Sequence, residues 1–174
     1  MQKEQFMSPF TAFCSSQKWP PIKIECPNPA YANEMLSNIG SCNSELSAVN
    51  LYLYNNIILT DTNRQFAEIF RKIAIVEMHH WQIFAQLARM LGADPRPWSI
   101  SCGSPVYWSP DCLTYPQQTK CLLENSLKGE QDAIAKYERQ ACSIRDSCVT
   151  ALLSRIILDE KIHVEIFREM LEQI

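Results

Sequence analysis

Three segments of this chain repeat apolar residues every three or four positions, and in each of them titratable residues interrupt the repeat near its middle. This spacing places the repeated side chains along one face of an α-helix. The segments span roughly residues 60–91, 117–142 and 147–174, and a less regular one spans roughly 29–58. We therefore predict an all-α chain with four long helices that share one core. The inward positions are Phe66, Phe70, Ile73, Glu77, His80, Phe84, Leu87 and Leu91; Leu123, Leu127, Glu130, Ile134, Tyr137 and Ala141; Val149, Leu153, Ile156, Glu160, His163, Phe167, Met170 and Ile174; and, less regularly, Met35, Cys42, Glu45, Val49 and Tyr52.

Local signals indicate where these helices begin and end. Asn28 followed by Pro29 is typical of a helix start, because asparagine caps free amides and proline suits the first helical position. Thr60 or Asp61 is predicted to cap the second helix, which ends at Gly92, where a left-handed conformation costs little. A short break at residues 143–146 separates the last two helices.

The connection between the second and third helices is long and rich in proline. Four prolines between residues 92 and 116 prevent one continuous helix there. Two short connections flanking this long crossover describe two helical hairpins. Because 174 residues suffice for one domain, we predict a four-helix bundle over residues 28–174. The preceding residues 1–27 are expected to form an irregular arm, packed on the bundle or partly disordered, with no visible chemistry.

Two histidines each follow a glutamate by three residues, in Glu77-Met78-His79-His80 and Glu160-Lys161-Ile162-His163. Residues three apart project from the same helical face, so each pair is a candidate bidentate metal grip. His79 points away from this face and is not expected to take part.

The positions of four glutamates along their helices predict that they meet at one level. At 1.5 Å per residue, Glu45 lies roughly 20 Å before the first hairpin turn and Glu77 roughly 24 Å after it. Glu130 and Glu160 both lie about 14 residues from the second turn. Two histidines and four carboxylates should therefore converge in the middle of the bundle.

The alternative is that these are solvated glutamates and ordinary core histidines, which is usual for a single Glu or His on a helix. It does not account for carboxylates on apolar stripes, where each costs several kcal/mol to desolvate and repels the others. Two divalent cations would neutralise four carboxylates. The pattern thus predicts two ions per chain, iron or manganese, with Glu77 and Glu160 as bridging carboxylates, Glu45 and Glu130 as terminal ligands, and His80 and His163 completing the two ions.

Several neighbouring residues are candidates for supporting roles. Asp159 is expected to accept a hydrogen bond from the outer nitrogen of His80. Tyr52 and Tyr137 follow Glu45 and Glu130 by seven residues, so their hydroxyls either bond a ligand carboxylate or simply pack in the core. Cys42, one turn before Glu45, is expected to pack in the core.

Composition excludes several function classes. The net charge is −3 and no basic run occurs, so neither nucleic acid nor an anionic membrane is an expected partner. No segment has the length and apolarity of a signal peptide or a membrane span, which predicts a cytoplasmic protein. The eight cysteines include no CxxC pair, so we expect reduced thiols, several of them in the core, and no rubredoxin-type iron site.

Residues 28–174 resemble the ferritin-like superfamily, most closely its rubrerythrin and manganese-catalase branches. The resemblance rests on the segments NPAY at 28–31, ELSA at 45–48, VEMHH at 76–80 and LDEKIH at 158–163. It implies a ferritin-like four-helix bundle with a dinuclear iron or manganese site. Where rubrerythrins carry an additional glutamate, this chain has Ala133, which favours manganese catalase over an NADH-linked peroxidase.

These observations predict an oxidoreductase that acts on hydrogen peroxide or dioxygen, catalase-like or peroxidase-like. Two alternatives stay open: a non-enzymatic metal-binding or coat-like structural protein, and a ferroxidase that feeds iron storage. Iron and manganese both accept mixed carboxylate and imidazole ligands, so the residues do not choose between them. We expect a homo-oligomer, with a dimer favoured.

Overall fold

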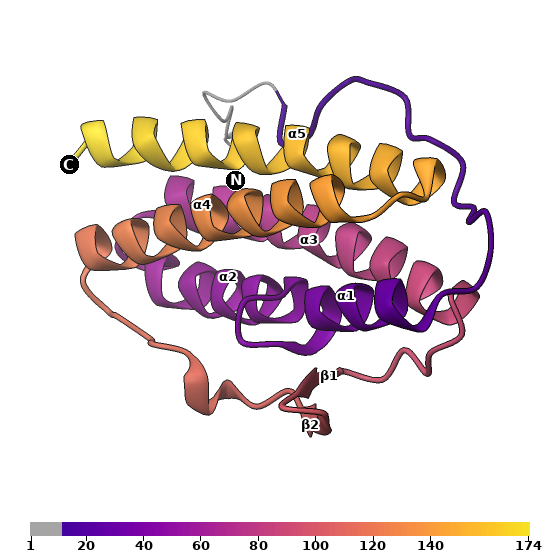
Figure 1. Ribbon diagram of the computed structural model, residues 1–174. Helices are drawn as coiled ribbons and strands as arrows, with labels where there is room; N and C mark the ends of the chain where they lie inside the picture. The colour runs from indigo at the N-terminus through magenta and orange to yellow at the C-terminus, as the bar shows by residue number, and fades with distance from the viewer. Residues whose placement is uncertain (1–11) are drawn as a thin grey trace, which may run out of the picture.

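The computed structural model describes residues 12–174 as a bundle of long helices with a small hairpin on one side (Figure 1). The elements are α1 (Pro29–Gly40), α2 (Glu45–Leu59), α3 (Arg64–Met90), β1 (Trp98–Ser101), β2 (Ser104–Tyr107), a short 3₁₀ helix η1 (Pro110–Cys112), α4 (Thr119–Ser143) and α5 (Ser147–Glu172). Helices α2 and α3 form one hairpin, and α4 and α5 form the other. Helix α1 lies end to end with α2, and both pack along α3. The predicted four-helix bundle of two hairpins joined by a long crossover is confirmed.

The predicted single helix over residues 29–58 is wrong, because a break at residues 41–44 divides it into α1 and α2. Ser41 caps the end of α1, and the Ser44 side chain accepts from the Ser47 amide at the start of α2. Serine and asparagine side chains compete for main-chain hydrogen bonds, so the sequence Ser-Cys-Asn-Ser favours a cap over a continuous helix. Lys136 on α4 holds the break by donating to the Asn43 carbonyl at 2.7 Å.

The other helix ends follow the local signals with one exception. Asn28 caps α1 by accepting from two amides, and Gly92 after α3 has a φ of 107°, as predicted. The predicted cap of α3 at Thr60 or Asp61 is wrong. Asn63 caps α3 instead, accepting from the Phe66 amide, because residues 60–63 are all needed to reverse the chain.

Apolar residues form two clusters, one on each side of a buried polar layer. The first contains Met35, Ile39, Phe84, Leu87 and Leu153, and the second contains Phe70, Ile73, Leu123, Phe167 and Met170. The predicted inward positions of α3 are all buried, whereas Ile174 at the end of the α5 stripe is 59% exposed. The polar layer therefore lies in the middle of the bundle, between the two apolar clusters.

The crossover between α3 and α4 contains a two-stranded antiparallel hairpin that rests on α1. Gly40 permits this contact, because a Cβ there would overlap the main chain of Pro97 and Trp98. Farther along, Cys112 in η1 forms a disulfide with Cys42 in the α1–α2 break, with Cα atoms 5.9 Å apart. The crossover is therefore attached to the bundle by the packing of the hairpin, by the disulfide, and by hydrogen bonds from Trp108 and Tyr115 to α2.

The disulfide corrects the prediction of reduced thiols with Cys42 in the core. The helix break moves Cys42 off the inward stripe to an exposed position, where it meets Cys112. The prediction that several cysteines are small core residues is also wrong: the six free cysteines are exposed or, for Cys148, half-buried. In the described part of the chain, no helix combines the length and apolarity needed to cross a membrane.

The arm before α1 contains no helix or strand over residues 12–28. It runs across α5 and around the end of the bundle to reach α1 (Figure 1). Trp19, Ile22 and Ile24 pack against the first apolar cluster. Residues 1–11 of the predicted arm lie outside the described residues.

Candidate metal centre

All six predicted ligands converge in the buried polar layer, and none is more than 2% exposed. Their ligand atoms form two groups of four, within 4.8 Å of one another in each group. One group contains Glu45, Glu77, His80 and Glu160, and the other contains Glu77, Glu130, Glu160 and His163. Glu77 and Glu160 therefore belong to both groups.

The helices present these residues in a nearly symmetric way. Glu45 is the first residue of α2, and Glu130 lies in the middle of α4. The two Glu-x-x-His pairs lie on α3 and α5, where three-residue spacing turns both side chains of a pair inward. Each helical hairpin thus contributes one single glutamate and one Glu-x-x-His pair.

Both imidazoles turn Nδ1 toward the carboxylates. His80 Nδ1 lies 3.0 Å from Glu77 Oε2 and 3.2 Å from Glu160 Oε1. His163 Nδ1 lies 2.9 Å from Glu77 Oε1, 3.1 Å from Glu160 Oε2 and 3.6 Å from Glu130 Oε1. Each Nδ1 therefore lies at a point where several possible ligand atoms meet.

The outer nitrogens establish the tautomers. His80 Nε2 lies 3.1 Å from Asp159 Oδ2, which is the expected partner, and His163 Nε2 lies 2.9 Å from the Phe13 carbonyl oxygen. The Phe13 carbonyl can only accept a hydrogen bond. Burial opposes the charge of Asp159, but its hydrogen bonds hold its pKa below the usual value, so this carboxylate also accepts. Both partners therefore require a proton on Nε2. In a neutral imidazole this leaves the Nδ1 lone pair facing the carboxylates.

Without cations, this cluster has more acceptors than donors. Glu77 Oε1 and Glu160 Oε1 have no hydrogen bond within residues 12–174. Burial raises the pKa of Glu130 to about 8 and that of Glu45 well above its usual value. Burial opposes the charge of His80, but the Glu160 carboxylate still raises its pKa well above the usual range. Buried oxygens and imidazole nitrogens around two points are the donor set of a divalent iron or manganese pair, so the residues fit such ions.

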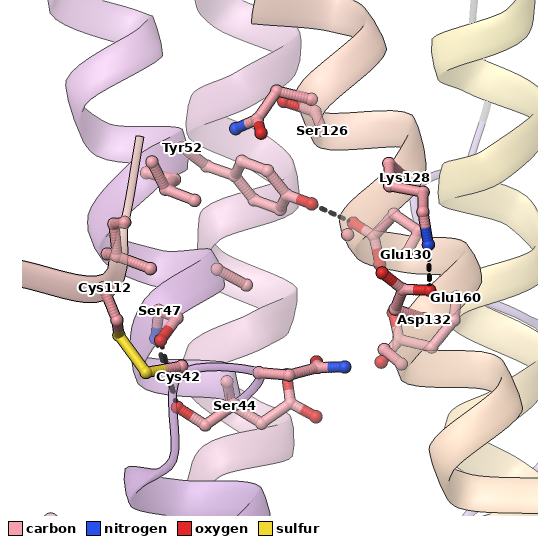
Figure 2. Close-up of a pocket in the computed structure, with 18 of the residues that line it drawn as sticks. Cys42, Ser44, Ser47, Tyr52, Cys112, Ser126, Lys128, Glu130, Asp132 and Glu160 are labelled. Carbon is pink, nitrogen blue, oxygen red and sulfur yellow. Dashed lines mark hydrogen bonds and ion pairs between the residues drawn. A yellow bond between two sulfur atoms is a disulfide. The ribbon is translucent and has the colours of Figure 1, made fainter. Parts of the chain in front are cut away.

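The two predicted tyrosines bond across the bundle. Tyr52 on α2 donates to Glu130 Oε1 on α4, as Figure 2 shows. Tyr137 on α4 donates to Glu45 Oε1 on α2 at 2.5 Å. Each hydroxyl therefore bonds a carboxylate of the opposite hairpin, and both rings also pack in the apolar clusters.

A cavity of about 290 Å³ reaches the site from the α2 and α4 side. Its lining includes the two tyrosines, Glu45, Glu130 and Glu160. The Cys42–Cys112 disulfide and the Lys128–Asp132 ion pair lie farther along its wall (Figure 2). His79 is exposed and stands edge-on to Trp19 with ring centroids 5.0 Å apart, away from the ligand layer.

On the opposite side, sequence reasoning found Asp159 but missed the groups that surround it and the partner of His163. Arg155 is 1% exposed and donates to Asp159 Oδ1 at 2.6 Å, and the Ser15 amide donates to the same oxygen at 2.6 Å. The spacing of four between Arg155 and Asp159 on a buried helical face was a usable signal. The Phe13 carbonyl and the Ser15 amide had none, because main-chain groups do not depend on residue type.

Comparisons with known proteins identify the family of this chain. The rubrerythrin family model matches residues 38–171. A probable manganese catalase of Clostridium acetobutylicum is 24% identical in an alignment 173 residues long. The match covers 88% of this chain and 75% of the relative.

Solved structures share the fold. KatB, a manganese catalase from Anabaena, matches with a TM-score of 0.81 at 20% identity, over 91% of this chain and 78% of its own. The bacterioferritin of Rhodobacter capsulatus matches with a TM-score of 0.70 at 22% identity, over 84% and 87%. These likenesses establish a ferritin-like helical bundle, and the family match establishes that the chain belongs to the rubrerythrin family.

Proposed function

We propose that this protein is a dinuclear iron or manganese oxidoreductase that acts on hydrogen peroxide or dioxygen, with catalase-like turnover favoured. The observation that carries the proposal is the sharing of Glu77 and Glu160 between two four-ligand groups, each completed by one glutamate and one histidine. Two cations of charge +2 would neutralise four carboxylates that otherwise repel one another in a buried layer.

The ligands divide into two sets. Glu45, Glu77, His80 and Glu160 would hold one ion, and Glu77, Glu130, Glu160 and His163 the other. When bound, such a pair supplies Lewis acidity and alternating oxidation states. Catalase turnover converts two molecules of peroxide into two of water and one of dioxygen, so it needs no external electron donor.

The protein's own residues would admit the substrate and move protons. The cavity of about 290 Å³ is large enough for peroxide and reaches Glu45 and Glu130. The tyrosine hydroxyls orient these two carboxylates through one hydrogen bond each. Both carboxylates line the cavity, so each is placed to exchange a proton with a bound substrate.

Support for catalase over peroxidase comes from Ala133, which lines the cavity where rubrerythrins carry an additional glutamate, and from the similarity to manganese catalases. The test is metal analysis of the purified protein with an oxygen-electrode assay. We expect about two ions per chain and steady oxygen evolution from peroxide by the manganese-loaded protein. A protein that is inert with both manganese and iron would refute the enzymatic proposal.

One observation favours a second candidate, a structural metal site. The six ligands lie between two apolar clusters, so metal binding there would appear directly as folding stability. In that case chelation would lower the melting temperature sharply while peroxide turnover stayed at background. Ferroxidation for iron storage would instead give a large hollow oligomer in size-exclusion chromatography.

A further inference from the structure

The segment Phe13–Trp19, here named the strap, crosses the bundle on the α3 and α5 side (Figure 1). This is the side of the two histidines, opposite the cavity. The strap lies outside the residues that the rubrerythrin family model matches. Its contacts nevertheless concentrate on the groups directly behind the ligand layer.

The first contact reaches a predicted ligand directly. The Phe13 carbonyl accepts from His163 Nε2 at 2.9 Å. The Phe13 side chain packs against the second apolar cluster, and the Lys72 ammonium lies 5.0 Å from the centre of its ring. The ring therefore anchors the carbonyl that orients His163.

The second contact reaches the other histidine through one carboxylate. The Ser15 amide donates to Asp159 Oδ1, and Asp159 Oδ2 accepts from His80 Nε2. The outer nitrogens of both imidazoles thus end on the strap, one directly and one through Asp159.

The third contact closes the arrangement around Arg155. This buried guanidinium donates to the Ser15 carbonyl at 2.7 Å and the Gln17 carbonyl at 2.8 Å, besides Asp159. The Trp19 ring covers it with a centroid distance of 4.1 Å. A buried cation needs such partners, so Arg155 holds the strap and Asp159 in one geometry.

We propose that the strap is a positioning element of the metal centre, which keeps Nδ1 of both imidazoles directed at the ligand layer, so that strap docking and metal binding stabilise each other. This rests on the proposed function only in that the six residues bind metal ions, whatever reaction follows. Outer partners of metal-bound histidines typically change metal affinity by about 10–100-fold. By linkage, bound metal must strengthen strap docking by the same factor.

A strap that merely covers apolar surface makes a different prediction. Loss of its anchors would then lower the stability of the metal-free and metal-loaded protein equally, and metal affinity would not change. Measurements of metal affinity and of strap docking distinguish the two roles, and neither depends on enzymatic activity.

The first experiment uses the double variant Phe13→Ala/Trp19→Ala, which removes both anchors and no ligand. The matched control is Cys14→Ala/Lys18→Ala, two exposed residues of the same segment. Manganese affinity is measured by competition with a chelator, and folding by circular dichroism. We expect the anchor variant to bind manganese about 10–100-fold more weakly and the control to match the wild type.

The second experiment needs no variant. Lys18 is exposed, so trypsin can cleave after it when the strap leaves the bundle. Manganese is expected to slow this cleavage by the same factor of about 10–100, while cleavage after Lys120, at the start of α4, reports any global effect.

The outcomes separate the two proposals. A wild-type protein that binds neither manganese nor iron overturns the proposed function, and the role of the strap with it. Two outcomes overturn the strap proposal alone, provided that the wild type binds metal. One is an anchor variant with unchanged manganese affinity, and the other is equal cleavage after Lys18 in the presence and absence of manganese.

Discussion

The two sides of the candidate metal centre differ far more than its ligand layer does. On the open side, formed by α2 and α4, carboxylates and tyrosine hydroxyls face a cavity. On the closed side, formed by α3 and α5, imidazoles face Asp159 and the main chain of the arm. Near-symmetric ligands thus sit in asymmetric surroundings, which leaves one side for substrate and proton exchange and the other for holding the ligands rigid.

The closed side is itself uneven. His80 bonds a carboxylate side chain that a substitution can remove, whereas His163 bonds a main-chain carbonyl that no substitution removes directly. Roles on this side must therefore be tested through the anchors of the strap, while roles on the open side can be tested at the side chains themselves.

The largest expected effect removes the ligand layer that both sides share. In Glu160→Gln an amide nitrogen replaces one carboxylate oxygen, and the neutral amide cannot bridge two cations. We therefore expect the metal content to fall from about two ions per chain to near zero. The measurement is metal analysis after dialysis. Glu169→Gln, an exposed change on the same helix, is the control and should retain its metal. Full metal content in the Glu160 variant would contradict the shared-ligand geometry.

Next in size is the pH dependence of the metal-free protein. The folded state keeps a proton on Glu130 up to pH about 8, whereas the unfolded chain releases it near pH 4.5. The contribution of this proton to the free energy of unfolding is therefore fully present below pH 4.5 and is lost as pH rises toward 8. His80 and His163, whose pKa values neighbouring glutamates raise although burial opposes this, act in the same direction.

We expect a loss of several kcal/mol between pH 5 and pH 8, since one proton is worth about 1.4 kcal/mol per pH unit. Thermal melts of the chelated protein measure it. Glu130→Gln should make the slope shallower, because that side chain no longer titrates while His80 and His163 still do. Manganese should reverse the sign of the slope, because ligands must lose protons to bind. A chelated wild type whose stability rises across this range would contradict the buried, protonated carboxylates.

The disulfide on the open side gives a smaller effect. Cys112→Ser opens a crosslink over a sequence separation of 70, so we expect the free energy of unfolding to fall by about 2–4 kcal/mol. Metal content should not change, since neither cysteine belongs to the ligand groups. Denaturant titration measures the loss, and Cys142→Ser, at an exposed free cysteine, is the control. Loss of metal on reduction would show that the crossover shapes the site itself.

The smallest effect concerns the hydrogen bonds on the open side. Tyr52→Phe or Tyr137→Phe removes one bond to a terminal carboxylate, which is worth about 1–3 kcal/mol. We expect peroxide turnover to fall roughly tenfold with little change in manganese content. The control is Tyr54→Phe, on α2 but outside the cavity lining. Unchanged turnover in both variants would assign the tyrosines to packing alone.

Prediction succeeded where local periodicity carries the information. The stripe of α3, from Phe66 to Leu91, is buried throughout, because a residue every three or four positions must face the same way on a helix. Glu45, Glu77, Glu130 and Glu160 meet because helical rise converts residue counts into heights. Prediction failed at residues 41–44, where polar caps compete with a helix that the apolar pattern alone would continue.

The sequence by itself determined the helical stripes of α3, α4 and α5 and the level at which titratable groups interrupt them, since both depend only on helical geometry. The tertiary structure alone decided which cysteines pair, which carboxylate each tyrosine bonds, and that the arm reaches behind both histidines. These contacts join residues far apart in the chain, and those of the arm use main-chain atoms that every residue shares. No pattern of residue types records such contacts, because they arise only when the folded bundle brings the segments together.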